Sequence, residues 1–465
     1  MKYDYHIIVI GAGSAGLVVA SGASNLGAKV ALIEGHKMGG DCLNYGCVPS
    51  KTFLHSAHTL QKAKKLKTLN HMDYDIQLDH VMKNVSDVIS DIAPHDSIER
   101  YESLGVKVYE GYASIKDGHT VLVNNQEITG KNIVIATGSS PFIPDIQGLN
   151  QVDYHTNETI FTLKKKPKRL IVLGAGPIGL ELGQGFSHLG SRVTIISRSK
   201  EIFKKEEPEV SGLMMDKLTR DGLDLKLGYK ILKVDKKEES IFLHIEKDGQ
   251  VEILEGDQIL LALGRQANTS GLNLQALGVK TLDKGFIKTN NKLMTDCPSI
   301  YACGDVVGPY LFTHMASYQA SIVIQNTIFP IKRKTDYTRV PWVTYTLPEV
   351  AHIGKLENHG DYDSHFIHLK DNDRAKANHE EIGFLKLITD KKGVLVGASM
   401  VSEHAGEQIA LANLAISKKM KLKDFLSMTV PYPTQAELFQ RLALNQLKDS
   451  FKDWQKNLVK KLFLK

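Results

Sequence analysis

Two stretches of the chain follow one pattern of apolar, small and polar positions. Residues 8–34 read IVIGAGSAGLVVASGASNLGAKVALIE, and residues 171–197 read IVLGAGPIGLELGQGFSHLGSRVTIIS. Each stretch begins with an apolar run rich in β-branched residues, which predicts a strand. A GxGxxG segment, a run of small and apolar residues that ends at glycine, and a second β-branched run follow. Each stretch is therefore predicted to fold as strand, turn, helix and strand.

The two stretches align without a gap at an offset of 163 residues. The identical positions include Gly11 and Gly174, Gly13 and Gly176, and Gly16 and Gly179. Between a strand and a helix, such glycines allow a tight turn, a close approach of a pyrophosphate and close helix packing, and the helix N-terminus faces the phosphates. A glycine-rich turn in an ordinary α/β core is the alternative for either copy alone. Two copies favour an α/β protein that binds two dinucleotides.

The copies differ at the end of the second strand, where the first has Glu34 and the second has Ser197 followed by Arg198. A carboxylate accepts a hydrogen bond from a ribose 2′-OH and repels a 2′-phosphate, whereas a hydroxyl beside a cation favours the phosphate. The sequence therefore predicts an adenosine cofactor without a 2′-phosphate in the first site. In the second site it predicts NADPH in preference to NADH. The alternative is that Arg198 is only a solvated residue after a strand.

Composition narrows the class of protein. The chain of 465 residues is long enough for about two to four domains. Its net charge of +6 is mild and gives no reason to expect a nucleic-acid partner. Its four cysteines are too few for a secreted disulfide framework. No stretch approaches the roughly 20 apolar residues of a spanning helix, and the N-terminus lacks the apolar region of a signal peptide, so we expect a cytoplasmic protein.

Two of the cysteines lie in the segment GGDCLNYGCVPSK (39–51). On an ideal helix, residues five apart have Cα atoms about 8–9 Å apart, whereas a disulfide needs less than about 7 Å. Cys42 and Cys47 can therefore pair only if the helix is distorted, which Gly46 makes easier. A metal site would need further ligands, and Cys297 and Cys303 have no matching histidine spacing. Taken alone, the pair fits a redox couple, structural thiols or metal ligands. The two predicted dinucleotide sites favour a redox couple that is reduced through FAD.

The segment GGDCLNYGCVPSK resembles the active-site segment of the class I flavin disulfide reductases, the family of glutathione reductase, dihydrolipoamide dehydrogenase and mercuric reductase. The resemblance extends to IVIATGSSP (133–141), LLALGRQAN (260–268) and SIYACGDVVG (299–308). It implies an α/β fold with two Rossmann-like domains, a C-terminal α+β dimerisation domain and a homodimer. The implied boundaries are 1–147 and 276–340 for the FAD domain, 148–275 for the NAD(P)H domain, 341–447 for the dimerisation domain and 448–465 for a tail.

The resemblance also implies the roles of individual residues. Cys47 would be the thiolate beside the flavin, Cys42 the interchange thiol that attacks the oxidant, and Lys51 with Glu181 an ion pair near the flavin ring. The residues implied for FAD binding are Gly11, Gly13, Ser14, Ala15, Gly16, Glu34, Lys51, Ala113, Thr137, Gly138, Ser139, Asp305, Thr313 and Ala316. Those implied for NAD(P)H binding are Gly174, Gly176, Gly179, Glu181, Ser197, Arg198 and Gly264. Electrons would pass from NADPH through FAD to the Cys42–Cys47 disulfide and on to a small-molecule or small-protein oxidant, and no metal site is implied.

The sequence departs from the family near its C-terminus. Most disulfide-reducing members carry HPTxxE, whose His, donated by the partner subunit, moves a proton to and from the interchange thiol. Here residues 432–437 read YPTQAE, so Tyr432 stands in place of the His while Glu437 is kept. Tyr has a reference pKa of about 10 against about 6.5 for His, and it is a poor general base at neutral pH.

This departure leaves the terminal oxidant open. Mercuric reductase also has a Tyr near this position, but it uses a C-terminal cysteine pair, and this chain has no cysteine after Cys303. A disulfide or similar oxidant is the main prediction. A mercuric or other metal-ion reductase, a dihydrolipoamide dehydrogenase and a non-catalytic flavin redox sensor are the alternatives.

The tail, residues 448–465, has apolar residues at helical spacing, namely Phe451, Trp454, Leu458 and Leu462. It also contains six lysines and two aspartates. Such a basic amphipathic helix allows peripheral contact with an anionic membrane. Packing of the apolar stripe on the partner subunit or on the parent domain is the favoured prediction.

Overall fold

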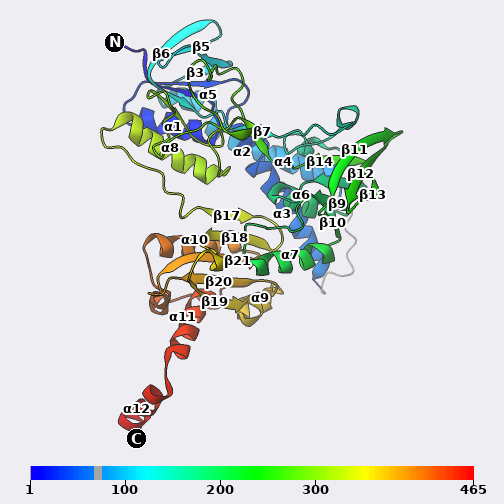
Figure 1. The fold of residues 1–465 in the computed structure, drawn as a ribbon, viewed down its shortest axis with the longest axis vertical. Helices are drawn as coiled ribbons and strands as arrows, with labels where there is room; N and C mark the ends of the chain where they lie inside the picture. Colours follow the sequence, from blue (N-terminus) through cyan, green and yellow to red (C-terminus); the bar gives the residue numbers. More distant parts are fainter. Residues whose placement is uncertain (1, 67–75, 465) are drawn as a thin grey trace. The chain divides into compact units, whose positions relative to one another are not determined.

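The computed structural model describes residues 2–66 and 76–464 and contains both helices and sheets, so the predicted α/β class is confirmed. The chain divides into two compact units (Figure 1). The first unit comprises Met1–Lys200 and Gly222–Asp336, and the second comprises Glu201–Asp221 and Tyr337–Lys465.

The first unit contains a seven-stranded sheet with strand order β3-β2-β1-β6-β5-β4, in which β16 also pairs with β6. The strands are β1 (Tyr5–Ile10), β2 (Val30–Glu34), β3 (Val106–Glu110), β4 (Ala113–Ile115), β5 (Thr120–Val123), β6 (Gln126–Ile135) and β16 (Ile300–Ala302). The pairs among β3, β2, β1, β6 and β16 are parallel. Residues 7–10 of the central strand β1 are all buried, as the unbroken apolar run requires in a sheet covered on both faces.

The helices of the first unit pack against its sheets or against one another. They are α1 (Ser14–Asn25), α2 (Gly40–Asn44), α3 (Cys47–Lys65), α4 (Leu78–Ile92), α5 (Ile98–Ser103), α6 (Pro177–His188) and α8 (Thr313–Ile328). Figure 1 shows α1 and α8 side by side, and their contact brings together segments about 300 positions apart in the chain. The helix α3 packs against both α4 and α6.

A second sheet in the first unit is parallel throughout and has the order β10-β9-β8-β14. Its strands are β8 (Arg169–Leu173), β9 (Arg192–Ser197), β10 (Leu223–Leu227) and β14 (Gln258–Leu261). This order corresponds strand by strand to β3-β2-β1-β6, and α6 lies between β8 and β9 in the chain as α1 lies between β1 and β2. The repeat seen in the sequence is therefore a repeat of structure that extends beyond the aligned residues.

Two smaller antiparallel sheets complete the first unit. One has the order β11-β12-β13, with strands β11 (Lys230–Lys237), β12 (Ser240–Lys247) and β13 (Gln250–Gly256). The other pairs β7 (Ser139–Pro141) with β15 (Arg265–Ala267). The short β7–β15 pair joins two segments that carry predicted cofactor residues.

The second unit is built on an antiparallel sheet with the order β17-β18-β21-β20-β19. Its strands are β17 (Pro341–Thr344), β18 (Glu349–Gly354), β19 (Asp363–His368), β20 (Phe384–Thr389) and β21 (Leu395–Ser402). Its helices are α7 (Pro208–Arg220), α9 (Asp373–Asn378), α10 (Ala405–Ser417), α11 (Glu437–Ser450) and α12 (Asp453–Phe463).

The segment 201–221 lies inside the predicted NAD(P)H domain, yet it belongs to the second unit. A buried ion cluster explains this grouping. Lys386 on β20 is only 2% exposed, and its Nζ lies 3.1 Å from Glu207, 2.8 Å from Glu209 and 2.6 Å from Glu357. A buried ammonium needs such partners because desolvation disfavours an isolated charge. The domain boundaries remain a prediction.

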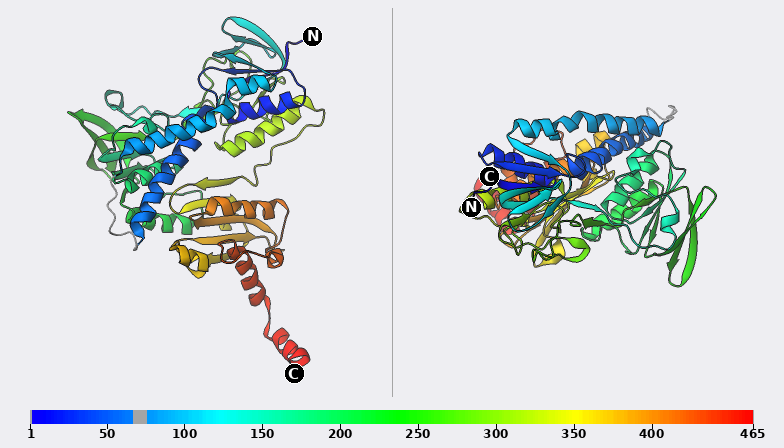
Figure 2. Two further views of the ribbon diagram at one scale, coloured as in Figure 1. Left: turned by 180° about the vertical axis from the view of Figure 1, so that it is seen from behind. Right: turned by 90° about the horizontal axis from the view of Figure 1, so that it is seen from above.

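The C-terminal tail differs from its prediction. It is not one helix, because α11 ends at Ser450 and α12 begins at Asp453 after an extended Lys452. No residue of α12 is buried, so the described residues do not show the packing on the parent domain that was one of the two predicted alternatives, and packing on the partner subunit stays a prediction. Figures 1 and 2 show α12 extending away from the five-stranded sheet.

Candidate active site

The three glycines of the first glycine-rich turn have different roles. Gly11 has a φ of +104°, and a Cβ there would lie 2.5 Å from the carbonyl oxygen of Ala136. A Cβ on Gly16 would lie 1.8 Å from the Gly11 oxygen. A Cβ on Gly13 would meet nothing closer than Gly40 Cα at 3.8 Å. The outer glycines are therefore required by the turn and by helix packing, while the middle one faces open space.

The second turn repeats this arrangement. Gly174 has a φ of +115°, and its Cβ would lie 2.3 Å from the Ala262 oxygen, while a Cβ on Gly179 would lie 2.0 Å from the Gly174 oxygen. A Cβ on Gly176 would have no atom within 4 Å. In both copies the open position lies at the N-terminus of a 12-residue helix, where backbone N–H groups and the helix dipole favour a phosphate. These two turns therefore fit a pyrophosphate each.

The two cysteines lie on separate helices. Cys42 is in the five-residue helix α2, and Cys47 is the first residue of α3. Between them, the backbone N–H groups of Tyr45 and Gly46 both donate to the carbonyl oxygen of Asp41, at 2.8 and 2.6 Å. Gly46 has φ −113° and ψ −103°, outside the helical region. The distortion that the spacing predicted is present, although both cysteines are free thiols in this structure.

The two thiols have opposite acidities. A hydrogen bond from Cys42, then one from Thr313 and the charge of Lys51, lower the pKa of Cys47 from about 9 to about 6 against the effect of burial. The same bond to Cys47, followed by burial, raises the pKa of Cys42. The position of Cys47 at a helix N-terminus also favours an anion. At neutral pH, Cys47 is therefore the thiolate and Cys42 the thiol.

An ion pair lies beside the thiols. Lys51 Nζ, one turn along α3 from Cys47, is 3.0 Å from Glu181 Oε2 on α6. The Glu181 side chain is buried and the Lys51 side chain is partly exposed. Because Glu181 follows Gly176 and Gly179 on α6, this pair connects the second glycine-rich turn to the helix that carries Cys47.

Thr313 and Asp305 come to this site from a distant part of the sequence. Thr313 begins α8, and its Oγ1 is 3.2 Å from Cys47 Sγ. Asp305 follows β16 and accepts a hydrogen bond from Ser139 Oγ at 2.8 Å. Burial raises the pKa of Asp305, against the opposing charge of Arg265. The predicted contacts of these residues with FAD remain predictions.

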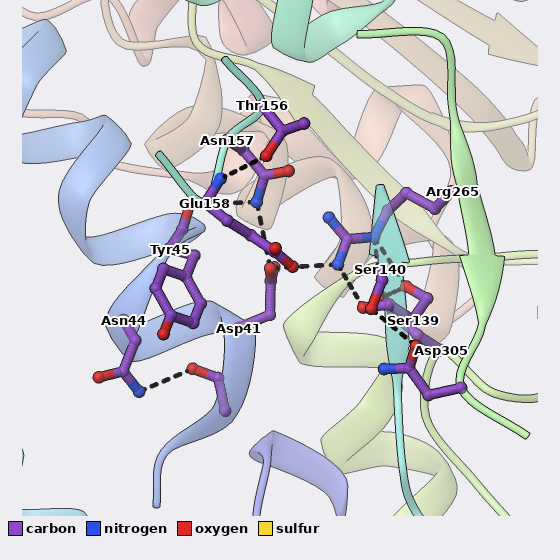
Figure 3. Close-up of polar contacts among 12 residues, drawn as sticks. Asp41, Asn44, Tyr45, Ser139, Ser140, Thr156, Asn157, Glu158, Arg265 and Asp305 are labelled. Atoms are coloured by element: carbon purple, nitrogen blue, oxygen red, sulfur yellow. Dashed lines mark hydrogen bonds and ion pairs between the residues drawn. The ribbon is translucent and has the colours of Figure 1, made fainter. Parts of the chain in front are cut away.

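Figure 3 shows a network centred on Arg265 that the sequence did not reveal. Arg265 Nε donates to Ser139 Oγ and its Nη2 to the Ser139 carbonyl oxygen, both at 2.7 Å. The same Nη2 lies 3.1 Å from Oδ1 of Asp41, the residue before Cys42. Asn157 Nδ2 also donates to Asp41 Oδ1, at 3.1 Å, and to the Tyr45 carbonyl oxygen, at 3.2 Å. Asp41 is thus held by a strand and a loop outside its own helix.

The remaining predicted cofactor residues lie at the ends of elements. Ser14 and Ala15 open α1, Ala113 opens β4, Thr137 and Gly138 connect β6 to β7, Ala316 is in the first turn of α8, and Gly264 precedes β15. Glu34 ends β2, and its carboxylate accepts from the backbone N–H groups of Ala12 at 2.6 Å and His36 at 2.8 Å. Ser197 ends β9, and its Oγ accepts from the Ser199 N–H at 3.1 Å.

Tyr432 and Glu437 belong to the second unit. The Tyr432 side chain is 70% exposed, and its hydroxyl donates to Asp373 Oδ2 at 3.1 Å. That hydrogen bond and the Asp373 charge raise the pKa of Tyr432. Glu437 begins α11, and its Oε2 is buried without a hydrogen-bond partner among the described residues. Glu380 Oε2 lies 3.8 Å from His404 Nε2. The same oxygen accepts a hydrogen bond from Nε2 of Gln435, in the YPTQAE segment, at 3.4 Å.

Outside residues 1, 67–75 and 465, no group of three or more His, Cys, Asp or Glu residues has the geometry of a metal site. Within the same residues, no helix is both long and apolar enough to cross a membrane.

Comparison with known proteins places the chain among redox enzymes. The family model described as pyridine nucleotide-disulphide oxidoreductase matches residues 5–321, and the model for the dimerisation domain of the same family matches residues 340–443. The dimerisation domain supports a homodimer.

Individual relatives agree with these matches. A mercuric reductase of Staphylococcus aureus is 39% identical over 455 residues, covering 96% of this chain and 83% of the relative. A dihydrolipoyl dehydrogenase of Geobacillus stearothermophilus is 29% identical over 456 residues, covering 94% and 95%. A solved Cu(II) complex of the HOCl-induced flavoprotein disulfide reductase RclA from Escherichia coli superimposes with a TM-score of 0.86 at 25% identity, covering 96% of this chain and 100% of that one.

Proposed function

The chain belongs to the class I pyridine nucleotide-disulphide oxidoreductases, which are FAD-dependent and linked to NAD(P)H, and on this premise we propose that it uses NADPH to reduce the Cys42–Cys47 pair and then an external oxidant. The observation that carries the proposal is the opposite acidity of two adjacent thiols at the head of α3. A structural thiol pair would need no such polarisation, whereas a redox couple uses a stable thiolate and a separate attacking thiol.

The two glycine-rich turns support the assignment of cofactors. The open positions at Gly13 and Gly176 leave room for two pyrophosphates, and Glu34 and Ser197 end the strands where the adenosine riboses would lie. When bound, FAD supplies the chemistry that accepts a hydride from a nicotinamide and passes two electrons to a disulfide. Ser197 and Arg198 favour the 2′-phosphate of NADPH at the second turn.

Lys51, Cys42 and Cys47 have different roles in the reaction of the dithiol. Lys51, fixed by Glu181, contributes a positive charge that stabilises the Cys47 thiolate. Cys42, once deprotonated, attacks one sulfur of a disulfide oxidant, forms a mixed disulfide and releases the first substrate thiolate. Cys47 then attacks the Cys42 sulfur, restores the Cys42–Cys47 bond and releases the second thiolate. Each cycle moves two electrons from the dithiol to the oxidant.

Tyr432 bears on the kind of oxidant. Because the Tyr432 hydroxyl donates to Asp373 and its pKa is raised, it stays protonated at neutral pH and cannot serve as the base that a His would provide. We therefore propose an oxidant whose leaving group departs readily as an anion, such as a disulfide of an acidic thiol. Such a leaving group needs little help from a general acid.

This part of the proposal is tested with a series of disulfides whose leaving thiols differ in pKa. The expected result is a steep rise of kcat/KM as the leaving thiol becomes more acidic, with an aryl disulfide reduced much faster than oxidised glutathione. A flat dependence would show that another group supplies the proton and would remove the argument from Tyr432.

Reduction of a metal ion is the second candidate, and it is favoured by the similarity to mercuric reductase and by the Cu(II) complex of the structural relative. A pair of thiolates is a suitable ligand set for a soft ion. The chain has no cysteine after Cys303, so it lacks a second pair that could hand the ion over.

One experiment separates the candidates. NADPH oxidation by the FAD-loaded enzyme is measured under steady state with lipoamide, oxidised glutathione, an aryl disulfide, Hg²⁺, Cu²⁺ and quinones. We expect activity with a disulfide that is lost in both Cys42→Ser and Cys47→Ser. Activity that survives both substitutions would contradict the dithiol proposal, and activity with Hg²⁺ or Cu²⁺ alone would establish the second candidate.

A further inference from the structure

The helix α12 presents a wide apolar face to its surroundings. Of its residues, Trp454 is 61% exposed and Phe463 is 76% exposed, and Leu458, Val459 and Leu462 are also exposed. These five large apolar side chains lie within a helix of 11 residues that buries none of its side chains in the described chain. Contiguous exposed apolar surface of this kind usually marks an interaction site.

The apolar residues share one side of the helix. At about 100° per residue, the five fall within one half of the helical circumference. Lys456, Lys460 and Lys461 fall in the other half, together with Asp453 and Asn457. A half-cylinder of apolar side chains opposite a row of lysines is the pattern of a helix that lies in the plane of a membrane surface.

We propose that α12 lies on an anionic phospholipid surface, with its apolar face at the boundary of the acyl chains and its lysines at the lipid phosphates. Charge complementarity supports this occupant. Residues 452–464 contain four lysines and a single carboxylate, Asp453, whose Oδ1 lies 3.5 Å from Lys456 Nζ. Lysines near an anionic surface are attracted to it, and Trp is favoured at the level of the headgroups.

One observation argues against the partner subunit as the occupant. The model of the family's dimerisation domain matches residues 340–443, so α12 lies outside the matched segment.

The test uses the full-length FAD-loaded protein and two vesicle preparations, one of pure phosphatidylcholine and one containing phosphatidylglycerol. Binding is measured by co-sedimentation, and a blue shift of tryptophan emission is assigned to Trp454 by its loss in Trp454→Phe. Leu458→Asp is compared with the matched control Asn457→Asp, because both add one negative charge to neighbouring positions on opposite faces. Neither residue packs on the described chain, so both variants are expected to fold and to keep wild-type NADPH oxidation.

We expect binding to the phosphatidylglycerol vesicles only, weakened by added salt. Leu458→Asp should lose more than about tenfold in affinity, and Asn457→Asp less than about tenfold, since it adds only one repulsive charge. Equal binding to both lipids, or equal losses in the two variants, would overturn the proposal. So would a change of oligomeric mass in Leu458→Asp without vesicles, because the apolar face would then belong to a contact between copies of the chain.

Discussion

Removing the thiol of Cys42 is predicted to weaken the acidity of Cys47. The hydrogen bond from Cys42 is the largest cause of the lowered pKa of Cys47, which is about 6. A hydrogen bond to a charged group contributes about 1.5–3 kcal/mol, which corresponds to about one to two pKa units. In Cys42→Ala the pKa of Cys47 should therefore rise to about 7–8. At pH 7 its thiolate fraction would fall from about nine-tenths to about half or less.

The assay is the pH dependence of alkylation by iodoacetamide in the reduced protein, with the Cys47 adduct measured by peptide mass spectrometry. The thiolate is the reactive form, so the rate falls as pH drops through the pKa. Cys42→Ser is the matched control, because its hydroxyl still donates and should keep the midpoint near that of the wild type. A midpoint that stays near 6 in Cys42→Ala, or that rises equally in both variants, would refute the hydrogen bond as the cause.

Five further variants test other parts of the structure. Gly176→Ala should keep the thermal stability but raise KM for NADPH by about tenfold or more, because its Cβ enters the open phosphate position. Gly174→Ala should instead lower the unfolding free energy by about 1–3 kcal/mol. Arg198→Glu should lower kcat/KM for NADPH by about 10–100-fold and leave that for NADH nearly unchanged, and equal losses would contradict it. Tyr432→His should raise the rate with oxidised glutathione by about tenfold or more, and a fall would show that Tyr432 serves another oxidant. Lys386→Met should lower the unfolding free energy by about 3–5 kcal/mol in denaturant titrations, because it leaves the buried Glu207 unpaired, and a loss below about 1 kcal/mol would contradict this.

The glycine-rich turns and the cysteine segment were predictable because their sequence patterns are local. The GxGxxG spacing and the position of Gly46 are read within a few residues, although the close approaches at Gly11 and Gly174 come from Ala136 and Ala262, more than 80 positions away. Local patterns of this kind predict the strands β1 and β2, the strands β8 and β9, and the placement of Cys47 at a helix N-terminus.

The rest of the site depends on contacts across long sequence distances. Arg265 reaches Asp41 over more than 200 positions, and no periodicity or spacing in the chain signals that contact. The only available signal was the presence of Arg265 in the LLALGRQAN segment. The grouping of 201–221 with the second unit also depends on a distant residue, Lys386, whose burial cannot be read from its own neighbours in sequence. Tertiary partners override what local sequence can specify.

The tethering of Asp41 determines how firmly Cys42 is held. A helix of five residues has no stability of its own in water, because isolated helices shorter than about 12 residues are marginal. The protection of α2 amides against hydrogen exchange should therefore depend on Arg265 and Asn157 rather than on the helix itself. Cys47, on a 19-residue helix packed against its neighbours, does not share this dependence. The attacking thiol thus rests on a segment that can open locally, while the thiolate rests on one that opens only with the surrounding core.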